Sequence, residues 1–303
     1  MNAFHAIGAP SALSTQTRCY ITGRDRLRKT TTTTFRCCHL RFCIDLGLEA
    51  RNMTIIFYDI PSTLPDNAWS PNTWKTRYCL NYKRVPYKTE WVEYPDIELL
   101  CKKLGIAPTS KKEDGSGRDH YTLPAIHDPA TGAYVSDSFA IAQYLDKTYP
   151  DTPRIFPEGT EGLQAAFDAA FMANLGELWA FALPAACVRL NPVSEEYFRR
   201  TRKAVYGKTM EEMVPKGEEA VRAWKGFEEG LGKVDAWYQK NRGKGNYLLG
   251  ETLSWGDIAV AGFLIWLRII WGEESREWKD IESWHGGRWK ALIESLKEYE
   301  TVN

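Results

Sequence analysis

The sequence predicts two domains, an α/β domain followed by an all-helical domain. Its length of 303 residues suits one large domain or two ordinary ones. Patterns typical of strands alternate with helical patterns as far as about residue 150, and only helical patterns recur after it. Between the two parts, residues 151–158 are bracketed by Pro150 and Pro157 and are predicted to form a stiff linker. We therefore expect domains at residues 53–150 and 159–303.

The first 52 residues differ in composition from the rest, and we expect them to be a disordered extension. They carry eight basic and three acidic residues, a net charge of +5, and include the run KTTTTTF, which has neither helical nor strand periodicity. Excess Arg and Thr with few acids is typical of a mitochondrial transit peptide. Alternatively, translation starts at Met53, directly before a clean strand pattern, and residues 1–52 are upstream sequence read as protein.

Composition and charge argue against several classes of function. The chain has 44% hydrophobic and 26% charged residues, as ordinary soluble proteins do. Residues 53–303 carry a net charge of −5 without a basic stripe, so no nucleic-acid partner is expected. The sequence contains no run of about 18 apolar residues, so no membrane span is predicted. Few, scattered cysteines after residue 52 fit the cytoplasm, or the mitochondrion if residues 1–52 are a transit peptide.

The first domain has the pattern β-α-β-α-β-β-α, which is the element order of a thioredoxin-like domain. Residues 54–60, TIIFYDI, are rich in β-branched and aromatic residues, as in a central strand. Ser70 before Pro71 is typical of a helix start, with Ser as the N-cap and Pro at the first helical position. The later elements are a strand at 87–94, a short helix at 95–104, a loop at 109–119, and two strands with a helix at 122–149.

Residues 122–149 contain two features suited to binding a short peptide. A residue before proline is held extended, so Leu123 keeps its N–H and C=O facing outward, and a cis bond to Pro124 would fix that geometry. Asp137 and Ser138 open a helix whose free N–H groups and partial positive charge favour a carboxylate. The alternative interpretation is a hairpin plus helix in an ordinary core.

These residues resemble the glutathione-binding half of glutathione transferases. The resemblance rests on Leu123-Pro124 and on Asp137-Ser138 opening an Ala-Ile-x-x-Tyr-Leu helix, and it covers about residues 53–303. It implies that the backbone at Leu123 and Pro124 pairs with the cysteinyl unit of glutathione, and that Asp137 and Ser138 hold its γ-glutamyl end. It also implies a homodimer and a helical-bundle second domain.

Glutathione chemistry needs a thiolate, and Ser70 is the candidate catalytic residue. A hydroxyl at a helix N-terminus can donate to the sulfur anion while the helix dipole adds to the effect, so the thiol pKa falls. The alternative is that Ser70 only caps the helix. Asn72, just inside the helix, is a second candidate for assisting the thiolate, whereas Tyr58 is a rival that we expect to pack in the core.

The pattern Ser-Pro-x-x-Trp-Lys-Thr-Arg-Tyr-x-Leu, from Ser70 to Leu80, is similar to bacterial β-etherase-type glutathione transferases and to the fungal etherase-related class. This resemblance implies bulky hydrophobic aromatic substrates, including aryl ethers. The alternative function is a non-catalytic carrier (ligandin) of hydrophobic aromatic compounds. In this architecture the second substrate lies between the loop before the first helix and the long helix of the second domain. Four aromatic residues are candidates for contacting it: Trp69, Trp74, Phe171 and Trp179.

Signatures of other chemistries are missing from the sequence. There is no HExxH, no P-loop and no GxGxxG at a strand–helix junction. Residues 53–303 contain only three histidines, which is little material for a metal site or a Ser-His triad. No metal is therefore expected.

The second domain shows four helical patterns, at residues 163–190, 215–240, 254–271 and 288–299, the first of them bent near Pro184. Ser254 and Asp257 predict a capping box at the start of the third helix, similar to that of glutathione transferase second domains. We expect Asp257→Ala to cost roughly 1–2 kcal/mol of stability without affecting ligand contacts.

Overall fold

The computed structural model describes residues 54–241 and 243–303, and the extension predicted at residues 1–52 lies outside this range. The first domain has the predicted α/β element order, with a small ribbon of β3 (Ser110–Lys111) and β4 (Asp119–His120) added within the expected loop. Its other elements, with η for 3-10 helices, are β1 (Ile55–Asp59), α2 (Pro71–Tyr82), β2 (Tyr87–Trp91), η1 (Tyr94–Asp96), α3 (Ile97–Leu104), β5 (Ala125–Asp128), β6 (Ala133–Ser136) and α4 (Ser138–Thr148).

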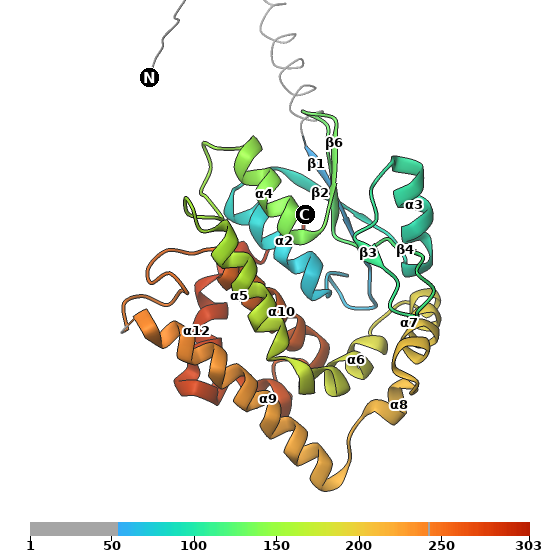
Figure 1. Ribbon diagram of the computed structural model, residues 1–303, viewed down its shortest axis with the longest axis vertical. Helices are drawn as coiled ribbons and strands as arrows, with labels where there is room; N and C mark the ends of the chain where they lie inside the picture. Colours follow the sequence, from blue (N-terminus) through green and yellow to red (C-terminus); the bar gives the residue numbers. More distant parts are fainter. Residues whose placement is uncertain (1–53, 242) are drawn as a thin grey trace, which may run out of the picture. The chain divides into compact units, whose positions relative to one another are not determined.

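The main sheet has the strand order β2-β1-β5-β6, with β1 parallel to β2 and the other neighbours antiparallel. Ile55 and Phe57 of β1 are fully buried because β1 is central and covered on both faces. α2 and α4 contact each other on one side of the sheet, and α3 lies on the other side (Figure 1). The predicted thioredoxin-like domain is confirmed.

A buried ion pair holds α2 against this sheet. Asp59, at the end of β1, accepts a hydrogen bond from Arg77 Nη2 at 2.6 Å, and neither side chain is exposed. The guanidinium also lies 5.0 Å from the ring centroid of Phe57 and 5.4 Å from that of Trp74. Burial raises the pKa of Asp59, and the charge of Arg77 opposes this shift. Because the pair positions α2, it also positions Ser70 at the start of that helix.

The second domain is helical, as predicted. Its elements are α5 (Glu161–Ala173), η2 (Gly176–Leu178), α6 (Trp179–Cys187), α7 (Pro192–Tyr206), α8 (Met210–Met213), α9 (Gly217–Tyr238), η3 (Gln239–Asn241), α10 (Trp255–Trp271), α11 (Arg276–Ser283), η4 (Trp284–Gly287), α12 (Arg288–Ser295) and η5 (Lys297–Tyr299). The sequence patterns did not predict α7, α8 or α11, each of which buries only one or two residues.

The first helical pattern is not one helix bent near Pro184, which lies inside α6. The break comes after Ala173, where α5 and the η2–α6 segment meet at 51°. Asn174 Nδ2 donates to the carbonyl of Ala170 at 2.8 Å, and such bonds compete with the helical ladder. α9 passes so close that a Cβ added to Gly230 would lie 2.2 Å from the Asn174 carbonyl oxygen. No single described helix is long and apolar enough to cross a membrane, although this bent pair reaches that length and composition.

The predicted capping box of α10 is confirmed. The N–H and the hydroxyl of Ser254 both donate to Asp257 Oδ2, at 3.0 and 2.9 Å. The other carboxylate oxygen accepts from the Leu248 N–H at 2.7 Å, which ties the preceding loop to the helix. Burial raises the pKa of Asp257 to about 6.

α10 packs directly against α2, so the core helix of the second domain supports the helix that carries Ser70 (Figure 1). Gly262 lies at the contact. A Cβ at this position would lie 2.9 Å from the carbonyl oxygen of Pro71 and 2.8 Å from Lys75 Cγ. The glycine that interrupts the apolar pattern of α10 is therefore what allows the close approach of the two helices.

Candidate active site

A cavity of about 200 Å³ lies where the first domain meets α7 of the helical domain. From the first domain, Ser70, Asn72 and Leu123 border it. From the helical domain, Tyr197 and Arg202 border it. The structure thus brings the predicted catalytic serine and the predicted backbone-binding leucine to one cavity.

Ser70 is the N-cap residue of α2, as predicted, but its side chain does not cap the helix. Its backbone is extended, and its carbonyl accepts from the Trp74 N–H at 3.0 Å and from the Thr73 hydroxyl at 3.1 Å. Among the described residues, no group forms a hydrogen bond with the Ser70 hydroxyl, although the residue is only 5% exposed. The hydroxyl is free to donate into the cavity, where the positive end of α2 favours an anion.

The bond between Leu123 and Pro124 is cis, the isomer that sequence analysis considered. The next residue, Ala125, enters β5 and pairs with Tyr58 of β1. Within the described part of the chain, neither the N–H nor the C=O of Leu123 has a backbone partner. A ligand backbone can therefore pair with this residue as an added strand does.

Asp137 is the N-cap of α4 and has φ 76°, a conformation that is rare for a residue with a side chain. Its Oδ1 accepts the N–H groups of Phe139 and Ala140, each at 3.0 Å. Its Oδ2 and the hydroxyl of the buried Ser138 have no hydrogen-bond partner among the residues described. Rare backbone conformations of this kind occur at binding positions. The start of α4 thus offers an acceptor for an ammonium group and donors for a carboxylate.

Lys75, in the second turn of α2, is a buried cation. It forms no ion pair with a carboxylate of the described chain, and its Nζ lies 5.7 Å from the ring centroid of Trp255 and 5.8 Å from that of Phe263. Burial lowers the pKa of this ammonium group, whereas the charges of Asp168 and Asp137 raise it. A positive charge from α2 therefore acts on the carboxylate that begins α4.

The four aromatic residues predicted to contact the second substrate do not border the cavity. Trp69, Trp74 and Phe171 are at most 3% exposed, and Trp179 packs against aromatic rings of α10. Aromatic residues at helical spacing usually face a core, and these do. A role for them in binding substrate stays a prediction.

Three residues that border the cavity were not predicted from the sequence: Tyr94, Tyr197 and Arg202. The rings of Tyr94 and Tyr197 are nearly parallel, with centroids 5.9 Å apart and planes at 11°. The Tyr94 N–H donates to Ser194 Oγ at 2.9 Å, which joins η1 to α7. Because α7 itself was not predicted, the sequence offered little to mark this wall of the cavity. The one signal was that Tyr197 and Arg202 lie within the same charged stretch.

Two other candidates differ in their surroundings. His120 borders the cavity, and burial lowers its pKa, helped by the positive charges of Arg202 and Lys112. It is therefore neutral at pH 7. Tyr58, by contrast, packs in the core of the sheet, does not border the cavity, and has its pKa raised to about 12 by burial. Only His120 is placed to meet a ligand.

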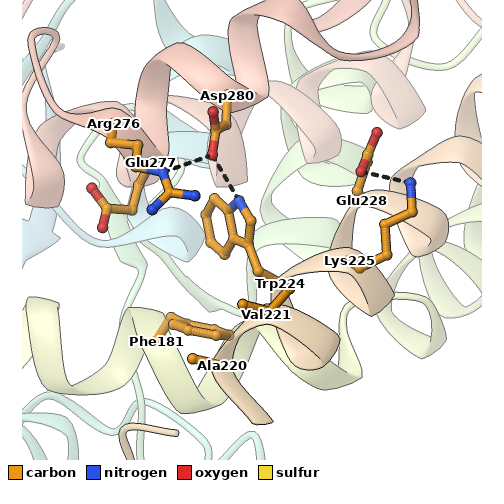
Figure 2. Close-up of a pocket in the computed structure, with 9 residues that line it drawn as sticks. All are labelled: Phe181, Ala220, Val221, Trp224, Lys225, Glu228, Arg276, Glu277 and Asp280. Carbon is orange, nitrogen blue, oxygen red and sulfur yellow. Dashed lines mark hydrogen bonds and ion pairs between the residues drawn. The ribbon is translucent and has the colours of Figure 1, made fainter. Parts of the chain in front are cut away.

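A second cavity, of about 330 Å³, lies within the helical domain between α6, α9 and α11 (Figure 2). The rings of Phe181 and Trp224 meet edge to face at 5.2 Å, and Trp224 Nε1 donates to Asp280 at 3.0 Å. Arg276 Nε lies 3.7 Å from the same carboxylate, and Val221, at the cavity edge, is 70% exposed. This cavity shares no residue with the one at Ser70. Its apolar part, formed by Phe181, Val221 and Trp224, suits a flat hydrophobic ring and is bordered by charged side chains of α9 and α11.

The fold and the site together define a two-domain protein. Its thioredoxin-like domain contributes two residues to one cavity: Leu123, whose backbone N–H and C=O are unpaired within the described chain, and Ser70, at the N-terminus of α2. Residues 69–148 match the family model of the glutathione S-transferase N-terminal domain, and residues 162–299 match that of the C-terminal domain. The chain is 35% identical to the glutathione S-transferase-like protein ustS of Aspergillus flavus, over 78% of this chain and 87% of that protein. It therefore belongs to the glutathione S-transferase family.

Solved structures agree with this assignment. A glutathione S-transferase of Ceriporiopsis subvermispora, crystallised in complex with glutathione, is 47% identical with a TM-score of 0.79, over 82% of this chain and 99% of that one. Glutathione transferase GSTFuA3 of Phanerochaete chrysosporium is 46% identical with a TM-score of 0.78, over 82% and 98%. The identity extends through both domains, so the likeness covers the whole described architecture.

Proposed function

We propose that this glutathione transferase uses Ser70 to stabilise the thiolate of glutathione for attack on bulky aromatic electrophiles or aryl ethers. One observation carries the proposal: Ser70 borders the cavity at the start of α2, and its hydroxyl has no partner in the described chain. A serine that served only as a cap would direct its oxygen to an amide of its own helix. An uncommitted donor beside the positive end of a helix lowers the pKa of a thiol placed there.

The other predicted residues have unpaired groups of the kinds that glutathione needs at its two remaining contact points, although Asp137 and Ser138, unlike Leu123, do not border the Ser70 cavity. The cysteinyl backbone pairs with the free N–H and C=O of Leu123, beside Pro124. The γ-glutamyl ammonium binds the unpaired Oδ2 of Asp137, and its carboxylate binds Ser138 and the first amides of α4. The structure of the Ceriporiopsis subvermispora relative with glutathione supports the same tripeptide here.

In the proposed reaction the thiolate sulfur forms a bond to the electrophilic carbon. The bond from that carbon to its leaving group breaks, and the leaving group departs with the electron pair. When the leaving group is a phenolate, a hydrogen-bond donor at its oxygen lowers the barrier. Tyr94 borders the cavity and keeps its proton because burial raises its pKa, so it can supply that donor.

Aromatic substrates are supported by the walls of the cavity. Tyr94 and Tyr197 present a paired aromatic surface on the side of the cavity formed by η1 and α7. Aryl ethers are supported by the Ser70–Leu80 pattern and its resemblance to etherase-type enzymes.

The test is the pKa of bound glutathione, followed by thiolate ultraviolet absorbance against pH. We expect Ser70→Ala to raise this pKa by about 1–2 units, since it removes the donor to the anion. Ser254→Ala is the matched control, because it removes a second helix-start hydroxyl away from the cavity. If the pKa is the same in Ser70→Ala and the wild type, Ser70 has no part in activation.

A second function, as a carrier of hydrophobic aromatic compounds, is supported by the cavity in Figure 2. Its aromatic floor and exposed Val221 favour a flat apolar ring. We expect a hydrophobic dye to bind there, and Val221→Asp to weaken binding without changing turnover. Displacement of the dye by an S-aryl glutathione conjugate would instead place it in the cavity at Ser70.

Assembly and location stay predictions. The homodimer implied by the resemblance is tested by sedimentation of the purified chain. The cytoplasmic location, with the mitochondrion as its alternative, is tested by fractionating cells that express the full sequence.

A further inference from the structure

The wall of the Ser70 cavity formed by α7 carries a positive charge as well as aromatic rings. Arg202 borders the cavity, and its guanidinium carbon lies 4.2 Å from the ring centroid of Phe198 and 5.8 Å from that of Tyr94. Its Nη1 donates to the Thr201 hydroxyl at 3.1 Å. These contacts hold the guanidinium in place without neutralising it.

Within the described residues, Arg202 forms no ion pair, unlike Arg199 of the same helix and Lys112 at the same cavity. Three residues earlier on the same helix, Arg199 pairs with Glu195 at 2.8 Å and with Glu211 at 2.6 Å. The other basic side chain at the cavity, Lys112, pairs with Glu98 at 2.9 Å.

The cavity therefore has an excess positive charge, and it resides on Arg202. Three charged side chains border it. Lys112 and Glu98 form an ion pair and cancel each other's charge, which leaves the guanidinium of Arg202. A partly buried guanidinium without a carboxylate partner is suited to binding an oxyanion, because its planar fork matches two oxygens. The aromatic surface of Tyr94 and Tyr197 lies beside it.

We propose that Arg202 is a subsite for an anionic group on the second substrate, so that the preferred electrophiles are aromatic acids rather than neutral aromatics. This rests on the proposed function. The ring packs on the Tyr94–Tyr197 wall while its carboxylate binds Arg202. Glutathione has a glycyl carboxylate of its own, but His120, which borders the cavity from the same domain as Leu123, is available to donate a hydrogen bond to it.

The probe is 4-chloro-3,5-dinitrobenzoate, compared with its methyl ester. In both, the thiolate sulfur bonds to the ring carbon that bears chlorine, the carbon–chlorine bond breaks, and chloride leaves with the electron pair. The carboxylate takes no part in the bond changes. The ester group withdraws electrons from the ring more strongly than a carboxylate does, so the ester is the more reactive probe without enzyme. The ratio of kcat/KM for the acid to that for the ester is therefore divided by the ratio of their uncatalysed rates with glutathione. This normalised acid-to-ester ratio reports the subsite.

We expect the full-length wild-type chain to prefer the acid, and Arg202→Gln to lower kcat/KM for the acid about tenfold or more, as loss of a charge-assisted hydrogen bond does. In the same variant, kcat/KM for the ester and the KM for glutathione should stay within about twofold of the wild-type values, a change of under 0.5 kcal/mol. Arg202→Lys should recover part of the loss, since it keeps the charge without the fork. Arg199→Gln, which removes a charge from the same helix outside the cavity, should leave the acid-to-ester ratio unchanged.

Three results would overturn the proposal. The first is an equal fall in kcat/KM for the acid and the ester in Arg202→Gln, which would mean that Arg202 has a structural role. The second is a raised KM for glutathione with an unchanged acid-to-ester ratio, which would assign Arg202 to the glycyl carboxylate. The third is a normalised acid-to-ester ratio of one or less for the wild type.

Calorimetry separates failure of this proposal from failure of the proposed function. The glutathione conjugates of the two probes are titrated into the wild type and into Arg202→Gln, so no turnover is needed. Tighter binding of the acid conjugate, lost in the variant, supports the subsite even in a chain that does not catalyse. Equal binding of both conjugates by the wild type refutes the subsite even if the chain is an active transferase.

Discussion

Two serines begin two helices that pack against each other, and they use their side chains in opposite ways. Ser254, at the start of α10, gives its N–H and its hydroxyl to Asp257. Ser70, at the start of α2, has a hydroxyl without a partner among the described residues. The difference lies at the third helical residue. α10 has the carboxylate of Asp257 there, whereas α2 has Thr73, whose hydroxyl donates to the Ser70 carbonyl.

This comparison shows how one residue type at one helix position serves folding in α10 and stays available for chemistry in α2. A carboxylate at the third position draws the serine into a local network, and its absence leaves the hydroxyl free for a ligand. Both serines are buried, so exposure does not distinguish them. Four experiments can break or sharpen the contrast.

The largest effect is expected for Asp257→Ala. The change leaves the Ser254 N–H, the Ser254 hydroxyl and the Leu248 N–H buried without their acceptor. We expect the free energy of unfolding in urea to fall by about 3 kcal/mol, more than the 1–2 kcal/mol of a cap alone. Glutathione affinity should be unchanged where the variant is folded. Lost affinity with intact stability would show that α10 acts on the ligand directly.

The next effect concerns the contact between the two helices. Gly262→Ala places a methyl group against the Pro71 carbonyl at the start of α2. We expect about 2 kcal/mol of destabilisation, together with a higher thiol pKa because Ser70 shifts with its helix. Gly162→Ala is the control, since its Cβ would meet nothing within 4 Å. If the two variants have the same free energy of unfolding and the same thiol pKa, the contact between α2 and α10 is not tight.

A smaller effect separates the two serines themselves. Ser254→Ala removes a donor to Asp257 and should cost about 1 kcal/mol in urea unfolding. Ser70→Ala removes a hydroxyl with no protein partner and should change the unfolding free energy by no more than about 0.5 kcal/mol. If Ser70→Ala destabilises the fold as much as Ser254→Ala does, its hydroxyl has a structural role after all.

The smallest effect is a pH dependence that shows only as a difference between variants. Asp257 has a pKa of about 6 in the folded protein against an ordinary value of 3.8, so the folded state holds the proton more tightly than the unfolded state. Its contribution to stability is therefore full below about pH 4 and is lost as the pH rises through about 6. Glu98 acts in the opposite sense, since hydrogen bonds from Lys102 and Lys112 lower its pKa to about 2.

The measurement is urea unfolding of the wild type and of Asp257→Asn at several pH values. Relative to the variant, the wild type should lose stability between about pH 4 and pH 6. The contribution of Glu98 cancels, because both proteins contain it. A difference that stays flat across this range would mean that Asp257 has an ordinary pKa.

Local features of the fold and of the site were predictable because their causes act over a few residues. Three helix starts are each marked by residues within one turn: Ser70 before Pro71, Ser254 with Asp257, and Asp137 with Ser138. The proline at position 124 restricts only the residue before it. The order of strands and helices follows from such signals, and with it the two-domain architecture.

Contacts between distant segments were decided by the tertiary structure alone. The break at Asn174 depends on α9 passing over it, and Trp69 and Trp74 are buried by neighbours that their own spacing does not reveal. Tyr94 meets Tyr197 and Arg202 because η1 and α7, about a hundred residues apart, are joined where the domains pack. Hydrophobic periodicity shows which face of a helix is buried, but not against what. The sequence by itself therefore determined the fold and the residues that we propose for binding glutathione, while domain packing decided the wall that we propose for the second substrate.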